Sequence, residues 1–457
     1  MREPPVGRGF KSHRSHLRNN YFYLLIIFHG VPALRVAVIS SEDSDVRASY
    51  RMLLNIIGVP WEEAEEIDPT EHLLAIIPEE AKLTPLVVPS IVIGSSLQRY
   101  FPESRRVADR ADVGIAGIKA PVYNIYSAPG DKFEGLPASF HEGNILVWFD
   151  LFRGAFKPLK DGSYSLFPLI YVYSRLLLKL MSYLCRRERF PLVRKMRWPH
   201  GFQCCISLGM EVRDIGKVRY LLERRQLAGK VTMLVNREAC ENASSKDLER
   251  VSSSLMNVGV LLERDLEGVE RLYDRISYLR GGKVGIRVNR PLGNFHRIRE
   301  NLLSLKPLYT SVSTIEGDIL SMGSPGPVAE QPREIPVALV EESISTFPAD
   351  LCSMERCFPI VVRNRDFLMS ILSLNCWISD FEGLLSWSEA RELSSVDIKY
   401  SGRELEIESS SRADGLVLEI ISSRELFPKE KMRIEGEKGR YLVRVPAGRS
   451  KIGFSVG

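Results

Sequence analysis

The sequence predicts an α/β protein in which a small parallel α/β domain precedes a distorted (β/α) barrel, with a small antiparallel β-sandwich after it. Short apolar runs alternate with amphipathic helical patterns over residues 31–125 and again over 201–393. This alternation is typical of parallel strands that are joined by helices. Residues 394–457 instead alternate polar and apolar side chains between turn signals, which predicts short antiparallel strands.

The composition is that of an ordinary globular chain, with 44% hydrophobic and 26% charged residues in 457, enough for about two to four domains. The net charge of +5 comes from 62 basic and 57 acidic residues that are well mixed, so we expect no nucleic-acid partner. The seven cysteines are scattered without a Cys-x-x-Cys spacing. We therefore expect reduced, buried thiols rather than a disulfide framework or a zinc site.

Residues 1–30 are expected to form a poorly structured tail. Basic residues precede the apolar run Tyr21–Phe28, which is far shorter than the ~20 residues that span a bilayer. A start codon assigned too early would explain this tail, and a weak membrane anchor is the alternative. We expect no transmembrane span and a cytoplasmic protein.

The segment 31–125 predicts a flavodoxin-like or Rossmann-like domain. A strand at Val36–Ser40 is followed by an amphipathic helix at Asp45–Ile57 and by apolar runs at Leu73–Ile77 and Leu86–Ile93. The turn Ser40–Asp45 has no glycine and three acids, which argues against a nucleotide site. A scaffold, or a docking surface for a protein partner, is the expected role.

Residues 126–200 are predicted to be a connector with a buried helix over 166–187. The run from Leu166 to Leu184 resembles a membrane span in its apolarity, but it contains Pro168, Arg175 and Lys179. Each charge at a bilayer centre costs ~2.5–3.5 kcal/mol on insertion scales. We therefore expect this helix to pack between domains.

The segment 201–393 predicts a closed or nearly closed barrel of parallel strands, with functional residues at the carboxyl ends of the strands. Helical patterns separate the early strand candidates. These candidates are Phe202–Val212, Lys230–Val235, Gly259–Leu262, Val284–Val288, Leu308–Ser313 and Ile335–Val340.

Two motifs in this segment carry a family resemblance. The first is Trp198-Pro199-His200-Gly201, leading into a strand with the tip Ser207-Leu208-Gly209-Met210-Glu211-Val212-Arg213, and the second is Arg287-Val288-Asn289-Arg290-Pro291-Leu292-Gly293. They resemble the polysaccharide deacetylase (NodB-homology) family, in which a Trp-Pro-x-Gly strand ends Ser-Leu-Thr-His-Asp-Val-Asp and a later loop reads Arg-x-Pro-Tyr-Gly. The resemblance implies a deacetylase-type barrel and a carbohydrate or envelope polysaccharide as ligand.

The chain departs from the family at its metal site. By position, the catalytic-base aspartate falls on Glu211 and the metal-ligand aspartate on Arg213, while the stretch Gly259–Asp265 has no histidine where the family has two. The late acid histidine is also missing, because the last histidine is His296, a residue more typical of a surface or helix cap. A guanidinium cannot bind a cation. The family metal, zinc for example, is therefore predicted to be lost, with no other cofactor implied.

The resemblance implies a role for seven residues. Glu211 takes the base position, Arg287 supports it, and Arg213 pairs with Glu211 in place of the cation. Substrate binding is expected from Arg213, Asp214, Asn289, Arg290 and Trp198, although a tryptophan in a Trp-Pro turn also commonly closes a core.

Three functions stay open at this point. The first is a catalytically impaired, deacetylase-like protein that binds a glycan or a partner in polysaccharide metabolism. The second is an active carbohydrate deacetylase or hydrolase with a non-standard site built on Glu211. In the third, the charged residues form a structural ion-pair network without a sugar ligand.

Overall fold

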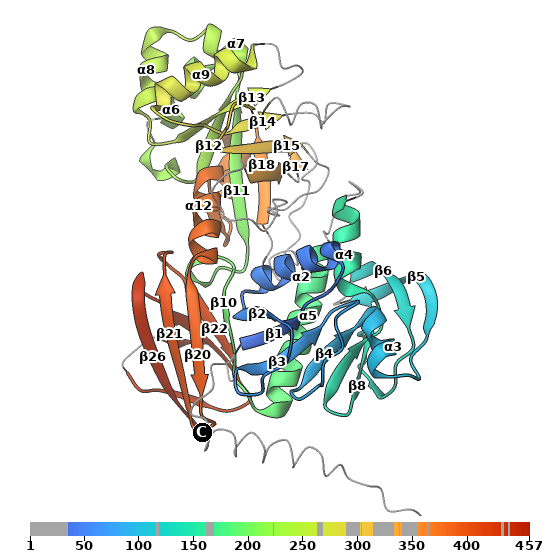
Figure 1. Ribbon diagram of the computed structural model, residues 1–457. Coiled ribbons are helices and arrows are strands. Elements are labelled where there is room, and N and C mark those ends of the chain that lie inside the picture. Colours follow the sequence, from blue (N-terminus) through green and yellow to red (C-terminus); the bar gives the residue numbers. More distant parts are fainter. Residues whose placement is uncertain are drawn as a thin grey trace, which may run out of the picture.

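The computed structural model describes residues 35–457 with internal gaps. It shows the mixed α/β chain that the sequence predicts, with a parallel sheet region at the top of Figure 1, the amino-terminal sheet below it and antiparallel sheets beside that. The gaps are 116–117, 161–168, 223, 263–267, 289–301, 303, 314–332, 338, 341–354, 356, 364, 431–433 and 437–438.

The amino-terminal sheet has seven strands in the order β2-β1-β3-β4-β9-β8-β7. Its first five strands are parallel and the last two are antiparallel. Strands β7, β8 and β9, from residues 131–147, extend this sheet. The sheet therefore continues beyond residue 125, where the sequence predicts that the domain ends. The strands are β1 (Arg35–Ile39), β2 (Trp61–Ala64), β3 (His72–Ile77), β4 (Ser90–Ile93), β7 (Asp131–Lys132), β8 (Ala138–His141) and β9 (Asn144–Val147).

Three helices share one core with this sheet: α2 (Ser44–Ile57), α4 (Leu151–Lys160) and α5 (Leu169–Glu188). The Asp43 side chain caps the start of α2, and Gly58 with a φ of 84° ends it, a conformation that favours glycine. Helix α5 confirms the helix predicted over 166–187 as a packed element. No helix among the described residues is long and apolar enough to cross a membrane. A short helix, α3 (Leu97–Tyr100), and a hairpin of β5 (Arg106–Ile115) and β6 (Ile118–Tyr126) complete this region.

The second sheet is wholly parallel and runs β16-β15-β14-β13-β12-β11-β18-β17, with β19 also paired to β11. Only residue 338 separates β16 from β17 in the chain, so the two ends of this order fall on neighbouring segments. That adjacency favours closure, although the barrel itself stays a prediction. The strands are β11 (Cys205–Val212), β12 (Val231–Val235), β13 (Asn257–Leu262), β14 (Ile286–Val288), β15 (Tyr309–Ser313), β16 (Arg333–Val337), β17 (Leu339–Val340), β18 (Cys357–Val362) and β19 (Trp377–Ser379).

The two faces of the second sheet differ. Alternate residues of β11, such as Ile206 and Leu208, pack in one core with the helices on the outer face. The inner face has glycines beside larger residues such as Leu234 and Leu261, and the rings of Tyr309 and Phe381 pack there edge to face at 5.5 Å. A Cβ on Gly285 would lie 1.9 Å from Tyr309 Cζ, so this packing requires a glycine. The helices are α6 (Ile215–Leu222), α7 (Arg237–Glu241), α8 (Ser245–Ser253), α9 (Val269–Arg280), α11 (Arg365–Ile371) and α12 (Phe381–Glu392).

The carboxyl-terminal part forms two four-stranded antiparallel sheets over a shared core, as the period-two pattern predicts. One strand, β10, comes from the predicted connector and pairs with β22. The sheets are β20 (Ser395–Tyr400), β21 (Glu404–Ser411), β26 (Gly448–Val456) and β23 (Leu426–Pro428), and β10 (Leu192–Lys195), β22 (Val417–Ile421), β25 (Arg440–Arg444) and β24 (Ile434–Glu435).

A disulfide joins Cys204 to Cys376, so the prediction that the cysteines are reduced is wrong for these two. Each residue directly precedes one of two paired parallel strands, β11 and β19, and this places their Cα atoms 5.0 Å apart. Because 172 positions separate them in sequence, no local spacing could indicate the bond. Four other cysteines, among those described, are buried and form no disulfide: Cys185, Cys205, Cys240 and Cys357.

Candidate functional site

The carboxyl ends of β11 and β18 form an ion pair at the mouth of the second sheet. Glu211 is 5% exposed near the end of β11, and Arg363 directly follows β18, whose Val362 pairs with Met210. The Nε–H of Arg363 donates to Glu211 Oε2 at 2.7 Å, and its Nη2 donates to Oε1 at 3.5 Å. Both oxygens of the predicted base position therefore accept from one guanidinium.

Arg287 lies on β14, where the charge of Glu211 influences it, and its role in supporting this carboxylate stays a prediction. The residue is 0% exposed. Burial lowers the pKa of Arg287 to about 10, and the Glu211 carboxylate opposes that shift. The guanidinium thus stays charged at neutral pH, within electrostatic reach of Glu211.

Arg213 pairs with Glu211 too, at a longer distance. Its side chain is 62% exposed, and its Nη2 lies 4.0 Å from Glu211 Oε2, whereas Arg363 makes the shorter contact at 2.7 Å. Arg213 directly follows β11 and Arg363 directly follows the paired strand β18, so both guanidinium groups reach the same carboxylate. Sequence reasoning missed Arg363, although the apolar run Phe358–Val362 directly before it was a usable strand signal.

The other predicted binding residues lie elsewhere. Asp214 caps α6, where its Oδ1 accepts from the Lys217 backbone N–H at 3.2 Å. Trp198 is 2% exposed, donates from Nε1 to the Glu355 carbonyl at 2.9 Å and stacks on Trp377. The prediction that its ring stacks on a sugar is therefore wrong, since the Trp-Pro turn is packed into the core. Asn289, Arg290 and His296 lie outside the described residues.

The residues described at this mouth do not fit a divalent cation. A hydrolytic zinc site is built from imidazole, thiolate or carboxylate ligands, and here Glu211 is already engaged by a guanidinium with a second one, Arg287, buried nearby. Within the described chain, three potential ligands gather instead at Glu62, Glu71 and His72, in the amino-terminal domain. Both nitrogens of His72 are engaged there, by the Asp68 N–H at 2.9 Å and by Glu62 at 2.8 Å.

A second cluster of charged residues lies at the carboxyl edge of the amino-terminal sheet. Asp43 follows β1, Glu79 and Glu80 follow β3, and Asp150 follows β9, so topology alone brings these acids to one edge. Arg153, in the first turn of α4, donates from Nη2 to Asp43 at 2.7 Å and to Glu80 at 2.8 Å, and from Nη1 to Asp150 at 3.3 Å. One guanidinium thus joins three strand ends.

Glu79 and Asp150 are fully buried behind this guanidinium. Burial raises the pKa of both carboxyls, and the charge of Asp150 raises that of Glu79 further. Asp150 accepts from the Ser95 N–H at 3.0 Å and from Asn124 Nδ2 at 2.6 Å, while Glu79 Oε1 accepts from the Phe152 N–H at 2.8 Å. In the described structure Glu79 Oε2 has no hydrogen-bond partner, so no donor there stabilises a negative charge on this oxygen.

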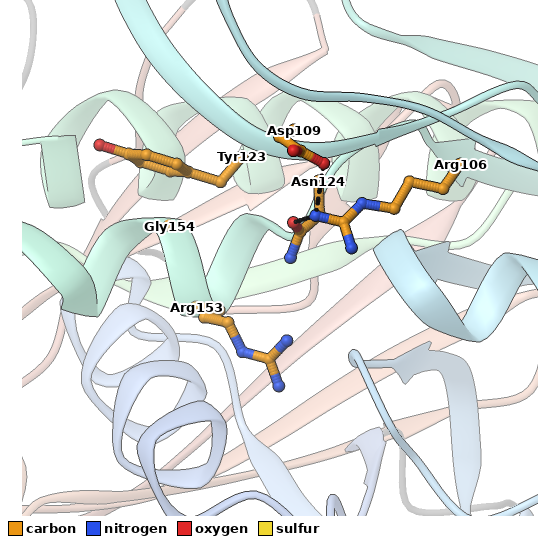
Figure 2. Close-up of a pocket in the computed structure, with 6 residues that line it drawn as sticks. All are labelled: Arg106, Asp109, Tyr123, Asn124, Arg153 and Gly154. Atoms are coloured by element: carbon orange, nitrogen blue, oxygen red, sulfur yellow. Dashed lines mark hydrogen bonds and ion pairs between the residues drawn. The ribbon is translucent and has the colours of Figure 1, made fainter.

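A hollow of about 240 Å³ opens beside this cluster. Figure 2 shows Asn124 between the side chains of Arg106 and Arg153. The sequence offered one signal for this edge, namely that acids directly follow two apolar strand patterns. The lining residues are Arg106, Asp109, Tyr123, Asn124, Arg153 and Gly154.

Comparison with known proteins adds little to these observations. No protein-family model matches the chain, and no curated protein matches it. Among solved structures, Agd3, described as a novel carbohydrate deacetylase, is 8% identical with a TM-score of 0.39, over 94% of this chain and 99% of that one. An alpha-amylase from H. orenii is 7% identical with a TM-score of 0.15, over 53% of this chain and 63% of that one. Similarities this weak carry no argument about the chain.

Proposed function

We propose that the parallel-sheet domain binds a carbohydrate at the mouth that carries Glu211, without deacetylating it. The ligand class comes from the resemblance of the Trp198 and Arg287 motifs to polysaccharide deacetylases. The lack of turnover rests on one observation, the pairing of buried Glu211 with Arg363 at 2.7 Å.

This pairing argues against the family reaction at Glu211. A general base must lie within hydrogen-bond reach of the proton that it removes, and a substrate would have to displace Arg363 from Glu211 to reach it. Metal-assisted deacetylation also needs a cation to polarise the acyl carbonyl and activate water, and the residues around Glu211 do not fit one. Binding is the activity that this geometry supports.

The guanidinium groups supply the contacts. Arg213 and Arg363 are both partly exposed at the mouth, and the planar guanidinium offers several N–H donors in fixed directions. Sugar hydroxyls and acetamido carbonyls accept such bonds. Because the buried carboxylate of Glu211 holds Arg363 by charge and by hydrogen bonds, the orientation of Arg363 is set before the ligand arrives.

Binding of an oligosaccharide panel to the full chain, followed by calorimetry, tests this role. Arg213→Gln and Arg363→Gln should each weaken binding by roughly tenfold, the loss typical of one charge-assisted hydrogen bond. Lys217→Gln is the matched control, because Lys217 is exposed nearby and pairs with Asp214 instead. A panel without any bound glycan, or two arginine variants that bind like the unaltered protein, would refute the proposal.

Acetate release decides between binding and catalysis. Acetylated chito-oligomers should release no acetate with the unaltered chain, with or without added Zn²⁺. Release that is lost in Glu211→Gln would establish the alternative, a hydrolase built on Glu211, and would overturn the assignment of a non-catalytic site.

A further inference from the structure

The hollow beside Asn124 lies where open α/β sheets bind ligands. In the order β2-β1-β3-β4-β9, the chain reverses its direction of strand addition between β1 and β3. Ligands of such sheets bind outside the carboxyl ends of the strands at this switch point. The hollow adjoins this edge through Arg153, which follows β9 and pairs with acids that follow β1 and β3. Its other lining residues come from β5, β6 and α4.

Arg153 is held in one orientation at this edge. Asp43, Glu80 and Asp150 accept only from its terminal nitrogens, which leaves its Nε–H for a further acceptor. Because three carboxylates already order the side chain, binding a ligand to Arg153 costs little conformational entropy.

Arg106 faces the same hollow from β5. Its Nη2 donates to Asn124 Oδ1 at 2.5 Å and pairs with Asp109 at 2.8 Å. Asn124 has a φ of 49°, in the left-handed region that residues other than glycine rarely adopt. That conformation is maintained where the Asn124 amide bridges Arg106 to Asp150, and such backbone conformations cluster at ligand sites.

We infer that this hollow is a binding site for a small molecule that carries a carboxylate, held between the guanidinium groups of Arg106 and Arg153. Two guanidinium groups from different elements match the geometry of an oxyanion. Tyr123 adds an aromatic wall, and about 240 Å³ suits a ligand of the size of one acidic sugar.

The acids of the cluster do not reverse this preference for an anion. Asp43, Glu80 and Asp150 direct oxygens at Arg153, and Asp43 also caps α2. Of the acids, only Asp109 lines the hollow, and its side chain is 88% exposed. The ligand therefore meets N–H donors rather than carboxylate oxygens.

The geometry also couples this site to the buried carboxyl pair. Asn124 Nδ2 and Arg153 Nη1 both donate to Asp150 Oδ2. A ligand that accepts a hydrogen bond from either group therefore weakens the bond between that group and Asp150. The groups that face the pair are Tyr126 of β6, Tyr173 of α5, Glu80 and Arg153. Binding of an anion should therefore be accompanied by proton uptake, and affinity should rise as the pH falls.

Calorimetry on the full chain with D-glucuronate tests this site, with glucose, glucosamine and inorganic phosphate for comparison. Glucuronate should bind, and glucose and glucosamine should bind at least about tenfold more weakly, because they lack the carboxylate. If inorganic phosphate binds as tightly as glucuronate, the restriction of the ligand class to carboxylates is overturned, and the site binds oxyanions in general. Equal binding of glucose, tighter binding of glucosamine, or no binding of glucuronate would overturn the inference.

Two variants locate the effect. Arg106→Gln should weaken glucuronate binding by about tenfold, whereas Arg105→Gln, at an exposed arginine directly before the same strand and outside the lining of the hollow, should leave it unchanged. Titration in two buffers of different ionisation enthalpy measures proton uptake, which Asp150→Asn should abolish because Asp150 is the carboxyl that loses its donors. Equal affinity in the two arginine variants would refute the site, and equal uptake in Asp150→Asn would refute the coupling.

Discussion

The buried Glu79 carboxyl should make the amino-terminal domain less stable as the pH rises. Burial and the charge of Asp150 raise the pKa of Glu79 well above its ordinary value of 4.5. Between that ordinary value, which holds in the unfolded chain, and the raised folded value, the folded state binds the additional proton. Stability therefore falls with pH by about 1.4 kcal/mol per pH unit in this window, and the effect is absent below it.

Glu79→Gln mimics the neutral acid and removes this dependence. The quantity to compare is the amide protection of the β3 and β4 peptides, expressed as the ratio of Glu79→Gln to the unaltered protein. Above about pH 5, this ratio should rise about tenfold per pH unit until Glu79 ionises in the folded state. Measuring hydrogen exchange of both proteins at the same pH cancels the intrinsic exchange rate. It also cancels carboxyls such as Asp43, whose pKa is lowered and whose effect has the opposite sign.

Glu80→Gln is the matched control. Its side chain is 42% exposed and pairs with the same Arg153, so its protection ratio should not climb with pH. If the Glu79→Gln ratio stays constant from about pH 5 to about pH 8, Glu79 is not protonated in the folded state, and the reasoning from burial is wrong.

Two further predictions concern packing and cross-linking. Gly285→Ala places a Cβ 1.9 Å from the Tyr309 ring and should lower stability by about 1–3 kcal/mol, measured by thermal unfolding; an unchanged Tm would show that the ring has room to move. Cys376→Ser removes a cross-link over 172 positions and should cost several kcal/mol, on the order of 2–5; reducing agent should lower the Tm of the unaltered protein but not of the variant, and equal shifts in both would contradict a disulfide.

Element type was predictable wherever the hydrophobic period was sustained. The alternation of Ser395–Tyr400 or the apolar run Leu73–Ile77 indicates a strand without any tertiary information, because one or both faces must be buried. Domain boundaries were less accessible. The hairpin that carries β9 adds to the free edge of β4, and nothing near residue 125 signals that a sheet continues there.

The candidate sites were predictable only in part, because their contacts join residues far apart in the chain. Position in the motif predicts that Arg287 supports Glu211, whereas the guanidinium that hydrogen-bonds to Glu211 comes from position 363, through strand order. Glu79 and Asp150 meet for the same reason. The acids that follow a strand can be read from the sequence, whereas which of them share an edge depends on topology.

Binding experiments should use the full chain, because buried charged contacts join its domains. Arg391 of α12 donates to the carbonyls of Asn55 at 2.9 Å, Lys195 at 2.9 Å and Met196 at 2.8 Å, so the end of α2 and β10 both depend on it. Removing the amino-terminal domain would leave a buried guanidinium short of acceptors, at about 1–3 kcal/mol for each unsatisfied donor. The same helix α12 carries Phe381 into the parallel-sheet core. If an isolated sheet domain failed to bind the ligand, the failure would therefore reflect a disturbed fold and would say nothing about the roles of Arg213 and Arg363.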